Sequence, residues 1–153
     1  QFAETFNCDL VIANKRRSIT QANTVEKIDI LSDSPLEDKT IWIVDDMIDT
    51  GGSVYTLVKE LKKRGVKHVN IAIIHPVLSG PAVQRLSKLH EEGFLEHFLC
   101  VDTIYIPEAM KKELPFMNVV SSARLAAEII YRINIGSSIT QFFCPEDPYS
   151  VLE

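Results

Sequence analysis

Short apolar runs rich in β-branched residues alternate along this chain with longer segments of helical period. The apolar runs predict strands, and they are nearly continuous, as in strands buried on both faces of a parallel sheet. Five such runs lie at residues 9–13, 40–44, 69–74, 98–102 and 116–120. A further run at residues 27–31 predicts a peripheral strand.

Three segments carry apolar residues at helical spacing. The clearest covers residues 52–64, and Gly65 follows it as a residue suited to end a helix. A second covers residues 81–92 with Ser79 as its expected N-cap, and a third covers residues 121–133. Strands that alternate with helices of this length predict an α/β fold with a mainly parallel sheet flanked by helices.

The composition argues against several classes of protein, including nucleic-acid-binding and membrane-spanning proteins. The 153 residues suit one compact domain. Sixteen basic against twenty-one acidic residues give a formal net charge of −5, which argues against nucleic acid as a partner, because binding a polyanion needs an excess of basic side chains. The apolar stretches are far shorter than the roughly 20 residues that span a bilayer, so no membrane association is expected. Three scattered cysteines, Cys8, Cys100 and Cys144, predict reduced thiols in a cytoplasmic protein.

The two ends of the chain suggest a part of a longer protein. The sequence begins with Gln1 and not Met, inside an amphipathic stretch that resembles the end of a longer helix. Residues 144–153 carry two prolines and several acidic residues, and we expect this tail to be poorly ordered.

Three carboxylates lie between the expected strand at residues 40–44 and the expected helix at residues 52–64. Asp45 and Asp46 directly follow the strand, and Asp49 comes three residues later. Two adjacent carboxylates can accept hydrogen bonds from a vicinal diol and can help to hold a divalent cation. This pair therefore indicates a binding site for a sugar.

The next four residues, Thr50-Gly51-Gly52-Ser53, open the helix and favour an anion. Free N–H groups at a helix start attract phosphate, glycines let the backbone approach closely, and hydroxyls add donors. A phosphate at one end and a diol at the other describe a ribose 5-phosphate. The alternative is a tight glycine turn between strand and helix with solvated acids.

Taken with two other stretches, this loop resembles a known family. Residues 44–53 resemble the ribose-phosphate-binding loop of the type I phosphoribosyltransferase fold. Residues 14–17, Asn-Lys-Arg-Arg, and residues 75–82, His-Pro-Val-Leu-Ser-Gly-Pro-Ala, resemble the ribose-phosphate pyrophosphokinase family within that fold. The ending at residues 136–143 also fits, so the resemblance covers residues 2–143.

The resemblance implies an enzyme of nucleotide biosynthesis that transfers a diphosphoryl group from ATP to the 1-hydroxyl of ribose 5-phosphate with Mg²⁺. It implies that Lys15 and Arg17 are catalytic and stabilise negative charge around the β-phosphate. The implied ribose 5-phosphate site comprises Asp45, Asp46, Asp49, Thr50, Gly51, Gly52 and Ser53. Thr-Gly-Gly-Ser stands here where the family often has Thr-Ala-Gly-Thr, a chemically mild departure.

The resemblance also suggests regulation and assembly. Ser138, Thr140 and Phe143 match positions of an allosteric site between subunits in phosphate-activated members, which implies a homo-oligomer. A polar C-terminal turn is the structural alternative for these three residues. We expect His75, which follows a strand, to be packed and hydrogen-bonded and not catalytic.

Members of the family have two similar domains, and residues 1–143 resemble the C-terminal one, with residues 144–153 as a tail. The first domain, which holds most of the ATP site, and the pyrophosphate loop are not in this sequence. We therefore expect the chain alone to bind ribose 5-phosphate weakly and to be inactive as a synthetase. A phosphoribosyltransferase and a non-catalytic regulatory subunit related to the synthetases are the alternatives, although Asp45, Asp46, Lys15 and Arg17 argue against the latter.

Overall fold

The protein is described by a computed structural model that covers residues 2–17 and 25–143. The chain divides into two compact units. Residues 9–120 form one, here called the sheet unit, and residues 1–8 with residues 121–153 form the other, here called the terminal unit.

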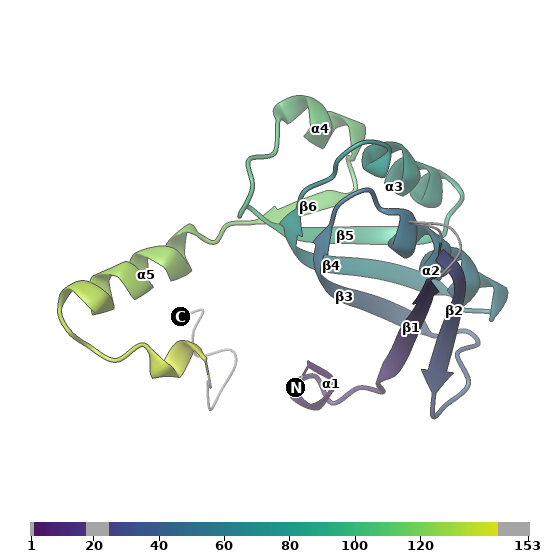
Figure 1. Cartoon of the computed structure of the whole chain (residues 1–153), viewed down its shortest axis with the longest axis horizontal. Helices are drawn as coiled ribbons and strands as arrows, with labels where there is room; N and C mark the ends of the chain where they lie inside the picture. The colour runs from purple at the N-terminus through teal and green to yellow at the C-terminus, as the bar shows by residue number, and fades with distance from the viewer. Residues whose placement is uncertain (1, 18–24, 144–153) are drawn as a thin grey trace. The chain divides into compact units, whose positions relative to one another are not determined.

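A four-stranded parallel sheet forms the centre of the sheet unit (Figure 1). Its strands, in spatial order, are β3 (Thr40–Ile48), β4 (His68–Pro76), β5 (Leu95–Val101) and β6 (Met117–Val120). Each strand coincides with a predicted apolar run, so the predicted α/β class with a parallel sheet is confirmed. Because all four strands run in the same direction, their carboxyl ends meet at one edge of the sheet, where open α/β sheets place their ligands.

The two N-terminal strands form a separate antiparallel pair. β1 (Val11–Arg17) and β2 (Val25–Ser32) pair from Val11 opposite Ser32 to Arg17 opposite Val25. The prediction that the first strand belongs to the parallel sheet is therefore wrong, whereas the peripheral position of the second is confirmed. Buried Ile28 and Ile30 alternate along β2 with half-buried Asp29, as is typical of an antiparallel strand with one covered face.

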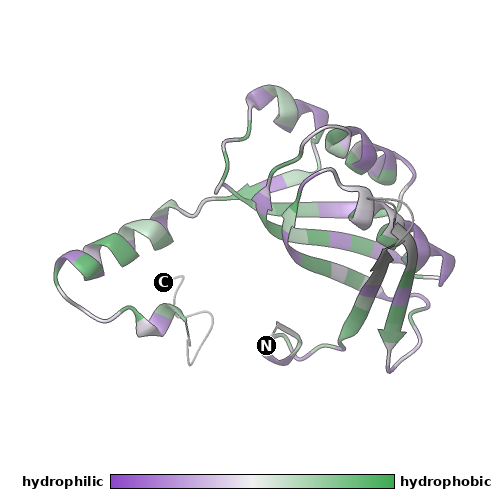
Figure 2. Cartoon of the chain, in the orientation of Figure 1, coloured by the Kyte–Doolittle hydropathy of each residue, from purple (hydrophilic) through white to green (hydrophobic). Residues whose placement is uncertain are grey.

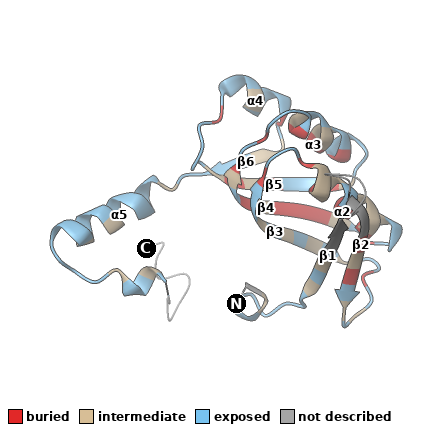
Figure 3. Cartoon of the chain, in the orientation of Figure 1, coloured by how far each residue is buried: buried red, intermediate tan, exposed pale blue. Residues whose placement is uncertain are grey.

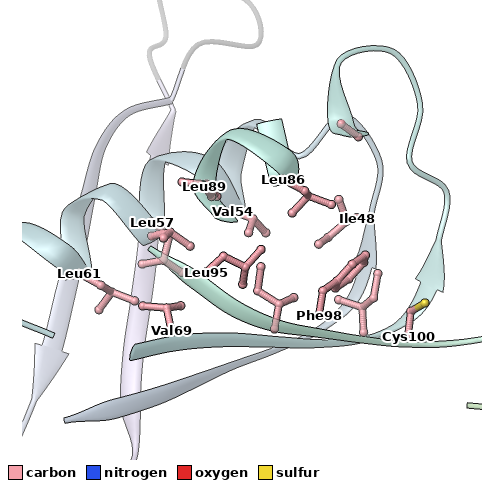
Figure 4. Packing of buried hydrophobic residues seen from close by; sticks show 14 of the residues in the cluster. Ile48, Val54, Leu57, Leu61, Val69, Leu86, Leu89, Leu95, Phe98 and Cys100 are labelled. Atoms are coloured by element: carbon pink, nitrogen blue, oxygen red, sulfur yellow. The ribbon is translucent and has the colours of Figure 1, made fainter. Parts of the chain in front are cut away.

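Two helices cover one face of the parallel sheet. The buried side chains of α2 (Gly52–Lys63) are Val54, Leu57, Val58 and Leu61. Those of α3 (Ala82–Glu91) are Ala82, Leu86 and Leu89. Figure 4 shows the labelled side chains of both helices pointing toward Val69 of β4 and toward Leu95 and Phe98 of β5. The apolar stripes predicted from helical spacing are therefore the faces that pack on the sheet.

The helix ends agree only in part with prediction. Gly65 follows α2 with a φ of 80°, and its N–H donates to the Lys62 carbonyl at 3.1 Å, so the predicted glycine ending is confirmed. The predicted N-cap role of Ser79 is wrong. Pro81 occupies the N-cap position of α3, and the Ser79 hydroxyl donates elsewhere, to the carboxylate of Asp49.

The opposite face of the sheet is apolar but exposed within the sheet unit. Apolar residues occur along the strands (Figure 2). Much of β4 is buried (Figure 3), but some apolar residues of β3 and β4 are exposed. Trp42 and Val44 of β3 are 46% and 47% exposed, and Ile74 of β4 is 47% exposed. These side chains are exposed because α2 and α3 pack on the other face of the sheet.

The terminal unit contains α1 (Phe2–Thr5), α5 (Ala123–Asn134) and the short 3₁₀ helix η1 (Thr140–Phe142). α5 coincides with the predicted third helix. α4 (Glu108–Glu113), in the sheet unit, has no counterpart among the predictions. The expected disorder of residues 144–153 concerns a segment outside the described residues. Of the helices that the structure describes, none is long and apolar enough to cross a membrane.

Candidate functional site

Asp45 and Asp46 lie within β3 and not after it, because the strand continues to Ile48, and Asp49 is the first residue after the strand. Consecutive residues of a strand point to opposite faces, and Asp45 is half-buried whereas Asp46 is exposed. One carboxylate oxygen of Asp45, Oδ1, accepts a hydrogen bond from the backbone N–H of Asp46 at 3.0 Å. The two acids therefore occupy different environments.

The backbone turns sharply at Gly51, the residue that precedes α2. Gly51 is buried and has a φ of 71° and a ψ of 5°, a left-handed conformation that favours glycine. A Cβ atom added there would lie 3.6 Å from the Cα of Ala82, so the loop packs against the start of α3. Gly51 stands where the family often has alanine. An alanine would be strained in this left-handed conformation, so the difference from Thr-Ala-Gly-Thr affects the backbone of this chain.

The start of α2 presents unbonded backbone donors. The first bond of the helix joins the N–H of Tyr55 to the carbonyl of Gly51 at 2.9 Å. Within residues 2–17 and 25–143, the N–H groups of Gly51, Gly52 and Ser53 donate to no group. These donors stand at the positive end of the helix dipole, so the junction could bind an anion. The phosphate-binding role of residues 50–53 stays a prediction.

The loop that follows β4 holds the cradle from one side. The N–H of Leu78 donates to the carbonyl of Ile48 at 2.9 Å, and the N–H of Ser79 donates to the carbonyl of Asp49 at 3.0 Å. The Ser79 hydroxyl donates to the carboxylate of Asp49. In this arrangement the Asp49 carboxylate stabilises the loop. The family-like stretch at residues 75–82 signalled this segment in the sequence, but not its contact with Asp49.

Arg85 of α3 also reaches the cradle. Its Nη1 donates to the carbonyl of Thr50 at 2.7 Å. A Cβ atom added at Gly52 would lie 3.3 Å from the same nitrogen. Sequence reasoning missed Arg85 because helical period alone gives it a polar position on α3, far along the chain from the loop.

His75 is the penultimate residue of β4 and lies at the same edge of the sheet. The Thr103 hydroxyl donates to the carbonyl of Ile74 at 2.9 Å, so it accepts a hydrogen bond from Nδ1 of His75, also at 2.9 Å. This network assigns the proton of a neutral imidazole to Nδ1. The predicted hydrogen-bonded histidine is confirmed.

The basic pair lies on the antiparallel strands. Lys15 pairs opposite Ile28 and Arg17 opposite Val25, with an irregular register between Arg16 and Arg17. The resemblance implies a flexible loop for this pair, whereas the structure places its backbone at the end of β1. The catalytic roles of Lys15 and Arg17 stay predictions.

The residues predicted to be allosteric form a local turn in the terminal unit. The N–H of Thr140 donates to the Ser138 hydroxyl at 3.2 Å, and the two hydroxyls lie 3.0 Å apart. Nη1 of Arg132 lies 3.5 Å from the carbonyl of Ser138, while Phe143 is 71% exposed. These contacts fit the polar-turn alternative, and the allosteric role stays a prediction.

The acids of β3 carry the type of oxygen that binds Mg²⁺. Among the described residues, three or more His, Cys, Asp or Glu side chains nowhere gather as a metal cluster. Mg²⁺ commonly uses one or two carboxylates together with substrate phosphates. The exposed carboxylate of Asp46 fits that mode of binding.

Known proteins resemble this chain along most of its length. The sequence profile of the phosphoribosyl transferase domain matches residues 1–110. The ribose-phosphate pyrophosphokinase of Burkholderia pseudomallei is 38% identical over 141 residues, which cover 92% of this chain and 42% of that protein. The ribose-phosphate pyrophosphokinase of Campylobacter jejuni is 35% identical, with the same shares covered.

A solved structure agrees with these sequences. The phosphoribosylpyrophosphate synthetase from Mycobacterium smegmatis superposes with a TM-score of 0.64 at 32% identity. The match covers 74% of this chain and 36% of that chain. The chain spans about two fifths of the length of the curated relatives that it matches.

Proposed function

The chain belongs to the phosphoribosyl transferase domain family, and on that basis we propose that it is the ribose 5-phosphate-binding domain of a ribose-phosphate pyrophosphokinase. Residues 1–143 would be the C-terminal domain of that enzyme. The observation that carries the proposal is the cradle at the start of α2. Its free N–H groups, from Gly51 to Ser53, lie at the end of β3 that carries Asp45 and Asp46.

The residues divide between the two ends of the substrate. The N–H groups of the cradle and the hydroxyls of Thr50 and Ser53 would bind the 5-phosphate. Asp45 and Asp46 would accept hydrogen bonds from the ribose hydroxyls. Since the two acids lie on different faces of β3, Asp46, the exposed one, is the main acceptor in this proposal.

The reaction of the whole enzyme requires more than this domain. The 1-hydroxyl oxygen of ribose 5-phosphate attacks the β-phosphorus of ATP, AMP leaves, and the hydroxyl proton is released. Lys15 and Arg17 would stabilise the charge on the transferred group. Mg²⁺ would be held by Asp46 together with substrate oxygens and would neutralise phosphate charge when bound. ATP would be bound mainly by the first domain.

We further propose that the full-length protein is a cytoplasmic homo-oligomer with Ser138, Thr140 and Phe143 at a regulatory contact, as the resemblance implies. The 153-residue chain alone would bind ribose 5-phosphate but form no phosphoribosyl pyrophosphate.

Calorimetric titration of the chain tests the substrate. Ribose 5-phosphate is expected to bind, and ribose to bind at least about 10-fold more weakly, because it lacks the charged group that the cradle recognises. Equal affinity for the two sugars, or no binding of ribose 5-phosphate, would contradict the proposal. Mixing the chain with ATP and ribose 5-phosphate should release no AMP, and measurable AMP would overturn the claim that the chain alone is inactive.

A further inference from the structure

Three consecutive carbonyls of the cradle loop are bonded to residues 78–85, a segment that comprises the end of the link between β4 and α3 and the start of α3. The carbonyl of Ile48 accepts from Leu78, and the carbonyl of Asp49 accepts from Ser79, both from backbone N–H groups. The third, Thr50, accepts from Nη1 of Arg85 at 2.7 Å, which is the shortest of the three contacts. The segment therefore draws the negative ends of three peptide dipoles toward itself.

The third carbonyl bears directly on the cradle because of peptide geometry. The peptide group that joins Thr50 to Gly51 is planar and trans, so its carbonyl and its N–H point in opposite directions. A carbonyl fixed on Arg85 directs the N–H of Gly51 away from that side chain. This N–H is one of the donors that make no bond within the described ranges.

The positive charge of Arg85 also favours an anion at the cradle. Residues 45–53 contain three carboxylates and no lysine or arginine, which is an unfavourable setting for a phosphate. Arg85 is half-buried and brings a permanent positive charge to the loop. Its bond to Thr50 is charge-assisted, a class of hydrogen bond that is stronger than a neutral one.

We infer that Arg85 is a positioning residue for the phosphate end of the ribose 5-phosphate site, acting through the Thr50–Gly51 peptide. The inference rests on the proposed function. Without Arg85 the peptide is free to turn its carbonyl toward the anion, which would replace a donor with an acceptor.

The test compares two ligands with the chain and its variants. Titrations with ribose 5-phosphate and with inorganic phosphate are followed by the ¹⁵N–¹H signal of Gly51. R85A is expected to weaken the binding of both ligands about 10-fold, the equivalent of one charge-assisted hydrogen bond. R85K should recover part of the affinity, since lysine keeps the charge but not the planar fork.

Two further variants separate positioning from general damage. D46N, at the sugar end, should weaken ribose 5-phosphate binding without weakening the binding of inorganic phosphate. K88A, an exposed residue of the same helix, should bind both ligands as the unchanged chain does. Thermal unfolding of each variant establishes that it is folded.

The outcomes distinguish the two levels of the proposal. If the unchanged chain binds neither ligand, the proposed function and this inference both fail. If it binds both and R85A binds inorganic phosphate equally well, only the role of Arg85 is overturned. An unchanged Gly51 signal on ligand addition would also overturn that role.

Discussion

The two glycines at the start of α2 serve different purposes. Gly51 needs a left-handed backbone, and Gly52 leaves space for the guanidinium of Arg85. Substitution of Gly51 would strain the backbone, whereas substitution of Gly52 would crowd a neighbouring side chain.

Substitution at the two positions should therefore differ in stability. G51A should lower the free energy of unfolding by about 1–2 kcal/mol, the cost of a left-handed conformation for a residue with a Cβ atom. G52A should change it less, because the added Cβ meets only the flexible end of Arg85. Urea unfolding of both variants checks this, and equal losses would show that backbone strain at Gly51 is not the cause.

Burial controls the chemistry of Cys100, which is 1% exposed in β5. Burial disfavours the thiolate and raises the pKa of Cys100 from its usual 9.0 to about 11. Near neutral pH the native chain should be alkylated at exposed Cys8 and not at Cys100, as peptide mapping by mass spectrometry would show. Comparable labelling of the two thiols in the native chain would contradict this.

The same shift has a consequence for stability. Because the folded pKa lies above the unfolded one, the unfolded state loses its proton first as the pH rises. The contribution of Cys100 is complete below pH 9 and is lost as the pH rises toward about 11.

At the level of elements, the parallel sheet has one face covered by α2 and α3 and one apolar face exposed within its unit. Phe98 of β5 is completely buried on the covered face, whereas Trp42 of β3 lies on the other and is 46% exposed. The two largest aromatic positions of the sheet thus contribute unequally to packing.

Truncation of these side chains should measure that difference. F98A should lower the free energy of unfolding by about 3–5 kcal/mol, since it removes a buried ring and leaves a cavity. W42A should cost less than about half as much, because much of the indole already contacts solvent. Guanidinium unfolding of both variants is the measurement. A larger loss for W42A would mean that its face is covered in solution.

Prediction from the sequence succeeded where local pattern decides the structure. The apolar runs and helical spacing give the four parallel strands, α2, α3 and α5. The pairing of β1 with β2 was not predictable, because an apolar run of strand length does not specify its partner. α4 was missed because six residues are too few to show a helical period.

The candidate site could likewise be predicted only in part from the sequence. Its glycines, hydroxyls and acids are contiguous in sequence, so their residue types could be read as an anion cradle beside a diol site. Ser79 and Arg85 lie 30 and 35 residues from their partners in the loop. Such contacts follow from how β3, β4 and α3 assemble, which no local pattern shows.

For the whole molecule, the structure separates the proposed activities. The cradle, the acids of β3, Arg85 and the basic pair all belong to residues 9–120, whereas Ser138, Thr140 and Phe143 belong to the terminal unit. Under the proposed function, substrate binding would belong to the sheet unit and the proposed regulatory contact to the terminal unit.

The exposed position of Trp42 also gives this chain an intrinsic fluorescent probe. It is the single tryptophan of the sequence, three residues before Asp45 on the strand that leads to the cradle. Its intrinsic fluorescence therefore originates from one known position. The wavelength of its emission maximum reports the solvent exposure of the apolar face of β3 in solution, without an attached dye.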